Sequence, residues 1–202
     1  MSLIKFVFQS PKHIYILFFR VFYYFILCFF NVIGNRLKLV KGIKGTKLKI
    51  RNYGTMSIGD NTVLSTINAI GDCHPFLCLY SLHGAFLSIG SGTKISNSTI
   101  FAANQIIIGN NVFIGADCKI YDHDFHSIKY KERMSKTDST VASKPVEIKD
   151  GAWIGAHSII LKGTVIGKRS VVGAGSVVAG KIIGDDEIWA GNPCRFIKRI
   201  DQ

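Results

Sequence analysis

The sequence predicts an all-β body in which short strands wind as successive coils of a triangular prism. Three observations support this fold class. Aliphatic residues recur every six positions in the C-terminal half, the same period returns in broken form earlier, and a long apolar run is confined to the N-terminal segment. A period of six fits neither the 3.6-residue helix nor a hairpin, but it suits a strand of two or three residues followed by a tight turn.

The unbroken part of the repeat begins at Ile148. Small residues stand two positions before most of its aliphatic residues, and glycine follows several of them. We expect the aliphatic side chains to point inward, the small residues to fill the corners, and glycine to tolerate the turns. The repeats group into triples, which predicts three faces and about five coils, each climbing by one strand spacing of roughly 4.8 Å. The repeat positions are Ile148, Ile154, Ile160, Ile166, Val172 and Val178, preceded by the triples Ile58, Leu64 and Ile70, Ile89, Ile95 and Phe101, and Ile108, Ile114 and Ile120.

Residues 1–50 are predicted to form a separate segment that contains an apolar helix. Ser10 is a suitable N-cap and Pro11 a suitable first helical residue. The run from Ile14 to Ile33 is twenty residues long and carries one charge, Arg20. This is about the length that crosses a hydrocarbon core. A spanning helix, a helix lying in one leaflet, and a helix packed against the body remain alternatives, and we favour association with the membrane.

The charge is distributed unevenly along the chain. Residues 1–51 contain ten Lys/Arg and no Asp/Glu, whereas the remainder contains fifteen Lys/Arg and thirteen Asp/Glu, a net +2. A nearly neutral body argues against nucleic acid as a partner, and a basic N-terminal segment favours an anionic membrane surface. By the positive-inside rule, the body should lie on the cytoplasmic face of the membrane.

A long polar loop interrupts the repeat at residues 121–147. It opens with the stretch YDHDFHS, which holds two histidines and two aspartates. A long loop that leaves a regular scaffold is usually functional. The residues alone allow a metal site, a catalytic site or a polar loop. The five cysteines form no CxxC pair, so we expect reduced thiols rather than a disulfide framework.

The run VEIKDGAWIGAHSIILKGTVIGKRSVVGAGSVVAGKI, followed by WAGNPCRFIKRI, resembles the hexapeptide-repeat acyltransferases. It is most similar to the galactoside, maltose and xenobiotic acetyltransferases and to the bacterial surface-polysaccharide O-acetyltransferases. The resemblance covers residues 51–202 and implies a left-handed parallel β-helix. It also implies a homotrimer with active sites between subunits, acetyl-CoA lying along the coils, and no metal.

The resemblance also implies roles for individual residues. His123 matches the general base, His126 matches a less constant histidine of the acceptor site, and Trp153 matches a side chain placed beside the base. Asp122 or Asp124 would orient His123, and the sequence does not choose between them. Five small residues match positions where the pantetheine arm of coenzyme A approaches the backbone: Gly155, Ala156, Ala174, Ala179 and Gly180. Two cations, Lys181 and Arg195, are candidates for binding the phosphates of coenzyme A.

The predicted function is an acetyl-CoA-dependent O-acetyltransferase acting on a sugar of a bacterial surface polysaccharide, such as lipopolysaccharide, or its lipid-linked precursor. A histidine suits direct transfer because an imidazole titrates near neutral pH. N-acetylation of an amino sugar is an alternative acceptor chemistry. Less favoured alternatives are a zinc enzyme of the same fold, with His123, His126 and His157 as ligands, and a non-catalytic trimeric scaffold.

Overall fold

The structure is a computed structural model that describes residues 48–65, 77–138 and 140–201. The chain divides into two units, Met1–Leu39 and Val40–Gln202, and all described residues belong to the second. The predicted helix over Ile14–Ile33, the repeat position Ile70 and the cysteines Cys28 and Cys73 lie outside them. Within the described ranges, no helix is both long and apolar enough to cross a bilayer. Membrane association therefore stays a prediction.

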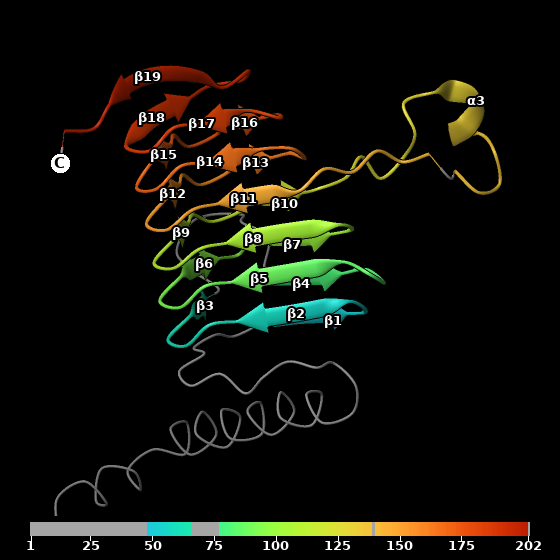
Figure 1. Ribbon diagram of the computed structural model, residues 1–202, viewed down its shortest axis with the longest axis horizontal. Coiled ribbons are helices and arrows are strands. Elements are labelled where there is room, and N and C mark those ends of the chain that lie inside the picture. The colour runs from blue at the N-terminus through green and yellow to red at the C-terminus, as the bar shows by residue number, and fades with distance from the viewer. Residues whose placement is uncertain (1–47, 66–76, 139, 202) are drawn as a thin grey trace, which may run out of the picture. The chain divides into compact units, whose positions relative to one another are not determined.

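The described chain winds through three parallel sheets, and each strand pairs with strands from the neighbouring coils (Figure 1). Sheet I contains β1 (Leu48–Asn52), β4 (Leu77–Ser81), β7 (Thr99–Ala102), β10 (Lys119–Tyr121), β13 (Ile159–Ile160) and β16 (Val177–Val178). Sheet II contains β2 (Thr55–Ile58), β5 (Phe86–Ile89), β8 (Gln105–Ile108), β11 (Val146–Ile148), β14 (Val165–Ile166) and β17 (Ile182–Ile183). Sheet III contains β3 (Val63–Ser65), β6 (Lys94–Ser96), β9 (Phe113–Ile114), β12 (Trp153–Ile154), β15 (Val171–Val172), β18 (Glu187–Ala190) and the antiparallel β19 (Arg195–Arg199).

This topology confirms the predicted all-β fold with parallel strands, and it is consistent with a left-handed β-helix. Sheet I holds six strands, where the repeat predicts about five coils. The difference arises at the two ends of the stack. Strand β1 begins at Leu48, before the first predicted triple, and β17 and β18 follow the last one.

The inward aliphatic residues form the core in the way that the repeat predicts. All six positions from Ile148 to Val178 are fully buried. Each buried side chain of this size contributes roughly 1.5–3 kcal/mol to folding. The small residues of the repeat do more than fill corners. The hydroxyl of Ser158 donates to the carbonyl of Gly173 at 3.1 Å, and that of Ser170 donates to the carbonyl of Gly184 at 2.6 Å, so these hydroxyls link successive coils.

One repeat position is predicted wrongly. Phe101 was expected to point inward, but Ile100 is fully buried in its place and pairs in register with Ile120. The inward residue Ile100 follows Ile95 by five positions, whereas Ile120 follows Ile114 by six. Because side chains alternate between the two faces of a strand, a shift of one residue turns Phe101 outward.

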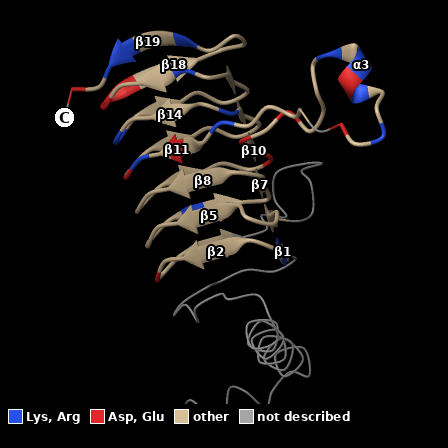
Figure 2. Ribbon diagram, turned by 45° about the vertical axis from the view of Figure 1, so that its right-hand side comes forward, with Lys and Arg blue, Asp and Glu red and all other residues tan. Residues whose placement is uncertain are grey.

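The polar loop leaves the corner between sheets I and II and forms an arm that projects from the stack (Figure 1). Its two limbs pair at the base, where His123 and Ser143 form an antiparallel bridge. The amide of Asp124 also donates to the carbonyl of Ala142 at 3.1 Å. The arm carries one short helix, α3 (Tyr130–Arg133). Figure 2 shows Lys and Arg on β19 and around α3, whereas the strands of the first coils are largely uncharged.

Candidate active site

His123 lies two residues after β10, at the root of the arm. Its side chain is 9% exposed. Its Nδ1 atom lies 3.3 Å from Oδ1 of Asp122 and is a buried nitrogen without an aligned hydrogen-bond partner among the described residues. The two groups are therefore close enough to attract each other electrostatically, but they are not aligned for a hydrogen bond.

Asp122 is fixed by the backbone of the preceding coil. Its carboxylate is fully buried and accepts hydrogen bonds from the amides of Ala103 and Asn104, both at 2.8 Å. These two amides lie in the turn between β7 and β8, which is the equivalent corner one coil earlier. Amide donors favour the ionised form of a buried carboxylate. The arrangement therefore holds a negative charge beside His123.

Two aromatic rings enclose the imidazole. The ring of Phe101 lies 5.0 Å from that of His123, and the ring of Phe125 lies 4.1 Å from it. Phe125 adopts a φ of +63°, which is uncommon for a bulky residue. This left-handed backbone accompanies the contact between its ring and the imidazole. The site residues predicted from the sequence included neither Phe101 nor Phe125. Phe101 was assigned to the core, and Phe125 lies in the loop, where the sequence has no periodic pattern.

Burial has a larger effect on the pKa of the His123 imidazole than the neighbouring carboxylates have. Removing the ring from water lowers the pKa of His123 below its usual value of 6.5, and the charges of Asp122 and Asp124 only partly oppose this. The lowered pKa favours the neutral form of the imidazole. A neutral imidazole beside a fixed carboxylate can accept a proton and is stabilised once it carries one.

Asp124 points to the scaffold rather than to His123. Its Oδ1 atom accepts from Nζ of Lys162 at 2.5 Å, and both side chains are partly exposed. Lys162 lies in the turn after β13, one coil beyond β10 at the same corner. The ion pair between Asp124 and Lys162 therefore connects the start of the arm to the next coil. Of the two aspartates that the sequence left open, Asp122 is the one within ion-pair distance of the imidazole.

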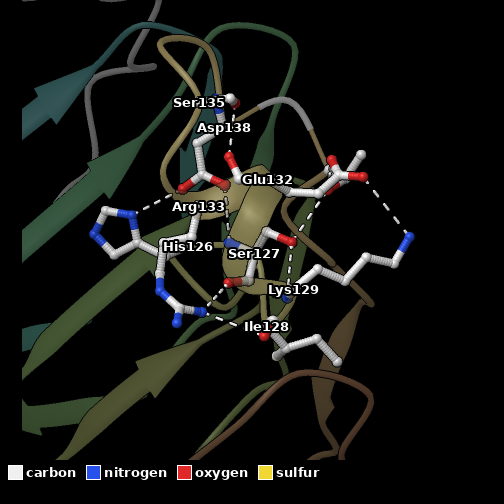
Figure 3. Close-up of polar contacts among 9 residues, drawn as sticks. His126, Ser127, Ile128, Lys129, Glu132, Arg133, Ser135 and Asp138 are labelled. Atoms are coloured by element: carbon white, nitrogen blue, oxygen red, sulfur yellow. Dashed lines mark hydrogen bonds and ion pairs between the residues drawn. The ribbon is translucent and has the colours of Figure 1, made fainter.

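His126 lies in the arm, where it pairs with Asp138 (Figure 3). Its side chain is 71% exposed, and Nδ1 lies 2.9 Å from Oδ2 of Asp138. The other oxygen of Asp138 accepts from the amide of Ser127 at 3.0 Å. These hydrogen bonds keep the pKa of Asp138 below its usual range, with that of His126 the larger cause. The guanidinium of Arg133 donates to the carbonyl of Ser127 at 2.7 Å and closes the fold of the arm.

Trp153 is not brought to His123 within one chain. It stands on β12 in sheet III and is 53% exposed, whereas His123 follows β10 in sheet I. The three histidines of the zinc alternative are also separated. His157 lies at the corner between sheets III and I, where Nδ1 is 3.4 Å from Asp117, and no group of three ligating side chains among the described residues is placed to hold a metal.

The predicted coenzyme A residues fall on two corners of the stack. Ala179, Gly180 and Lys181 lie between β16 and β17, at the corner of His123 and two coils beyond it. Gly155, Ala156 and Ala174 lie at the corner between sheets III and I. A Cβ on Gly155 would meet the backbone nitrogen of Ala174 at 2.4 Å, so its lack of a side chain is already required by the stacking of the coils.

The two predicted phosphate-binding cations gather near Cys194. Both Lys181 and Arg195 lower the pKa of the Cys194 thiol, but burial is the larger effect and raises it. Cys118 is also buried, and its thiol pKa is raised for the same reason. A thiol with a raised pKa is a poor nucleophile at neutral pH. The described cysteines are thus unsuited to a covalent intermediate.

Comparison with known proteins defines the class. Residues 145–180 match the family "Bacterial transferase hexapeptide (six repeats)", and residues 105–120 match "Hexapeptide repeat of succinyl-transferase". The chain is 34% identical over 174 residues, 81% of this chain and 85% of the relative, to "Putative acetyltransferase YJL218W" of Saccharomyces cerevisiae. The chain therefore belongs to the hexapeptide-repeat acyltransferase family.

Two relatives from Escherichia coli are O-acetyltransferases by name, one of lipopolysaccharide biosynthesis and one of galactosides. The "Putative lipopolysaccharide biosynthesis O-acetyl transferase WbbJ" is 29% identical over 75% of this chain and 76% of its own length. A galactoside O-acetyltransferase is 33% identical over 61% of this chain and 59% of its own length.

Two solved structures share the fold. AntD, an N-acyltransferase from Bacillus cereus in complex with dTDP and 3-hydroxybutyryl-CoA, is 25% identical with a TM-score of 0.65, covering 85% of this chain and 87% of AntD. A hexapeptide-repeat acetyltransferase from Vibrio cholerae in complex with acetyl coenzyme A is 26% identical with a TM-score of 0.51, covering 80% and 73%.

The titration of His123 tests the electrostatics of the site. We expect the His123 pKa in the folded protein to lie below 6.5, because burial dominates. Asp122→Asn should lower it further, since it removes an attraction to the imidazolium. Phe125→Ala should raise it toward the usual value, since it admits water. Histidine NMR, assigned with His123→Gln, measures all three, and a wild-type value above 6.5 would contradict the assignment.

Proposed function

We propose that the protein transfers an acetyl group from acetyl-CoA to a sugar hydroxyl of a surface polysaccharide or of its lipid-linked precursor. The observation that carries the proposal is His123, a buried imidazole whose pKa is lowered by burial and whose Nδ1 atom lies 3.3 Å from the fixed carboxylate of Asp122. Family membership supplies the reaction class, acyl transfer. The sugar acceptor is supported by the names of the two Escherichia coli relatives.

His123 acts as the general base. The neutral imidazole accepts the proton of the acceptor hydroxyl while the oxygen attacks the thioester carbonyl, and it later gives the proton to the departing thiolate. Asp122 stabilises the imidazolium in between, because its charge is held by two backbone amides and cannot relax away. The acyl group passes directly to the acceptor, since the described cysteines are buried and burial raises the thiol pKa of Cys118 and Cys194.

The acyl donor approaches along the corner between sheets I and II. Ala179 and Gly180 are small and exposed there, two coils from His123, and Lys181 and Arg195 supply positive charge for phosphates. His126, which is exposed in the arm, is available to an acceptor rather than to the donor.

A complete site requires a second copy of the chain. Trp153, Gly155, Ala156 and Ala174 lie on or beside sheet III, away from the corner that carries His123. Outward apolar residues line this face in register, with Phe113 45% exposed beside Trp153. We infer a homotrimer in which this face of one copy meets the His123 corner of the next.

A second acceptor chemistry is supported by AntD, an N-acyltransferase whose structure contains dTDP. Transfer to the amine of a nucleotide-linked amino sugar would need the same base and donor. The N-terminal charge pattern favours an acceptor at a membrane and does not distinguish O-acetylation from N-acetylation. The chain would be held at the cytoplasmic face of the bacterial inner membrane by residues 1–50, where lipid-linked glycans are assembled.

Replacing His123 tests the general base. We expect His123→Ala to lower kcat for acetyl transfer from labelled acetyl-CoA to membrane glycolipid extracts by about 10²- to 10⁴-fold. His126→Ala should mainly raise KM for the acceptor. Thermal melting controls for folding of both variants. Equal rates for wild type and His123→Ala would eliminate His123 as the base, and absence of transfer in the wild type would reject this donor and acceptor pair.

Mixed assemblies test the shared site. His123→Ala and Trp153→Ala should each be impaired alone, but a mixed trimer contains one junction at which both side chains are native. Co-refolding the two variants should therefore restore roughly one site in three per mixed trimer. Recovered activity is measured against each variant refolded alone. If mixing restores nothing while mixed trimers form, the site does not combine His123 and Trp153 from different copies.

Vesicle flotation tests the membrane assignment. The full chain should float with vesicles that contain anionic phospholipid and should be released by detergent but not by high salt, because apolar insertion is insensitive to screening. Release by salt alone would indicate that only the basic residues bind. A chain that never floats would remove the argument for a membrane-bound acceptor.

A further inference from the structure

Outward side chains from neighbouring coils form a continuous column on sheet I that ends at His123. Arg51 on β1 is in register with Tyr80 on β4, and Tyr80 is in register with Phe101 on β7. The guanidinium carbon of Arg51 lies 5.9 Å from the centroid of the Tyr80 ring, and the rings of Tyr80 and Phe101 stack with centroids 5.5 Å apart. The Phe101 ring then contacts His123 at 5.0 Å. We call Arg51, Tyr80 and Phe101 the aromatic column.

The core does not need these rings. The inward neighbours on the same strands, Leu79 and Ile100, are fully buried and fill the interior. Tyr80 and Phe101 are instead half-buried on the outer face. The ring faces are covered within the column, since Arg51 lies over Tyr80, Tyr80 stacks on Phe101 and Phe101 packs against His123, so the two aromatic rings present their apolar edges. The column therefore offers a sugar an apolar surface that leads to the base.

The far end of the column is the guanidinium of Arg51. Arg51 is exposed, and its contact with Tyr80 leaves its hydrogen-bond donors available. Over residues 48–65, 77–138 and 140–201, no carboxylate pairs with it. A guanidinium presents donors in a planar fork that matches phosphate oxygens. Its position predicts an anionic group in the ligand.

We propose that the aromatic column binds the acceptor, and that the acceptor is a sugar linked to a phosphate or diphosphate. The sugar lies against Phe101 and Phe125 beside His123, and the phosphate binds Arg51. Three strand spacings separate β1 from β10, roughly 14 Å along the sheet, which an extended hexosyl diphosphate can span. Nucleotide-linked and lipid-linked sugars share this chemistry. The proposal rests on the proposed function and narrows its substrate class.

Matched acceptors test the phosphate assignment. With acetyl-CoA as donor, kcat/KM is compared for four forms of one hexose: the methyl glycoside, the 1-phosphate, the uridine diphosphate derivative and a short-chain polyprenyl diphosphate derivative. In the wild type, a phosphate-bearing acceptor should exceed the methyl glycoside by about 10-fold or more, as expected for a hydrogen-bonded charge pair. Whichever diphosphate is preferred identifies the carrier.

Arg51→Gln should abolish this preference, because it lowers kcat/KM for the phosphate-bearing acceptors about 10-fold more than for the methyl glycoside. Lys168→Gln, an exposed cation in the turn between β14 and β15, is the matched control and should change neither value. Tyr80→Leu should weaken all four acceptors. The assignment is overturned if the wild type shows no preference for phosphate, or if Arg51→Gln retains the preference.

A binding measurement separates this proposal from the proposed function. Calorimetric titration of the wild type with the hexose 1-phosphate and the uridine diphosphate derivative needs no acyl transfer. Affinity should fall about 10-fold in Arg51→Gln and partly return in Arg51→Lys, which keeps the charge. If this pattern appears without acetyl transfer, the column binds glycosyl phosphates and the proposed reaction is wrong. If neither ligand binds, or Arg51→Gln binds equally well, the column is not a phosphate-directed platform.

Discussion

Each coil of this protein depends on its neighbours for backbone hydrogen bonds, and this dependence decides where side chains can stand. A two-residue strand such as β13 has no stability alone and persists because β10 and β16 flank it. In-register stacking then repeats side-chain positions from coil to coil. The same constraint that aligns the inward aliphatic residues also aligns Arg51, Tyr80 and Phe101 on the outside. The site is therefore assembled in columns, although its members are distant in sequence.

The arm shows how a functional insertion is compatible with this constraint. The chain leaves sheet I after Tyr121 and rejoins sheet II at Val146, which pairs in register with Ile106 of the preceding coil. At the departure point the carboxylate of Asp122 accepts the two corner amides of the preceding coil. One buried aspartate thus satisfies the scaffold and places a negative charge beside His123. In the proposed mechanism, the residue that satisfies the scaffold also stabilises the charged imidazole.

The scaffold could be predicted from the sequence because its rule is local and repeated. The six-residue spacing predicts that Ile148, Ile154 and Ile160 all point inward, and all three are buried in the structure. The exceptions arise where the period changes. Phe101 turns outward because the inward Ile100 follows Ile95 by five positions instead of six, and a single-residue shift cannot be seen in a broken repeat. The choice of Asp122 over Asp124 required three-dimensional contacts, since Asp124 pairs with Lys162, 38 residues away.

Strand β19 has a consequence for the stack as a whole. A parallel coil that ended at β18 would leave an open row of backbone groups on sheet III, the same kind of edge on which every earlier coil was built. Strand β19 instead pairs with β18 in the antiparallel direction and carries Arg195, Lys198 and Arg199. Like charges on an edge oppose the approach of a second identical edge. Strand β19 therefore ends the parallel repeat on sheet III, and its positive charges oppose the end-to-end association of two copies.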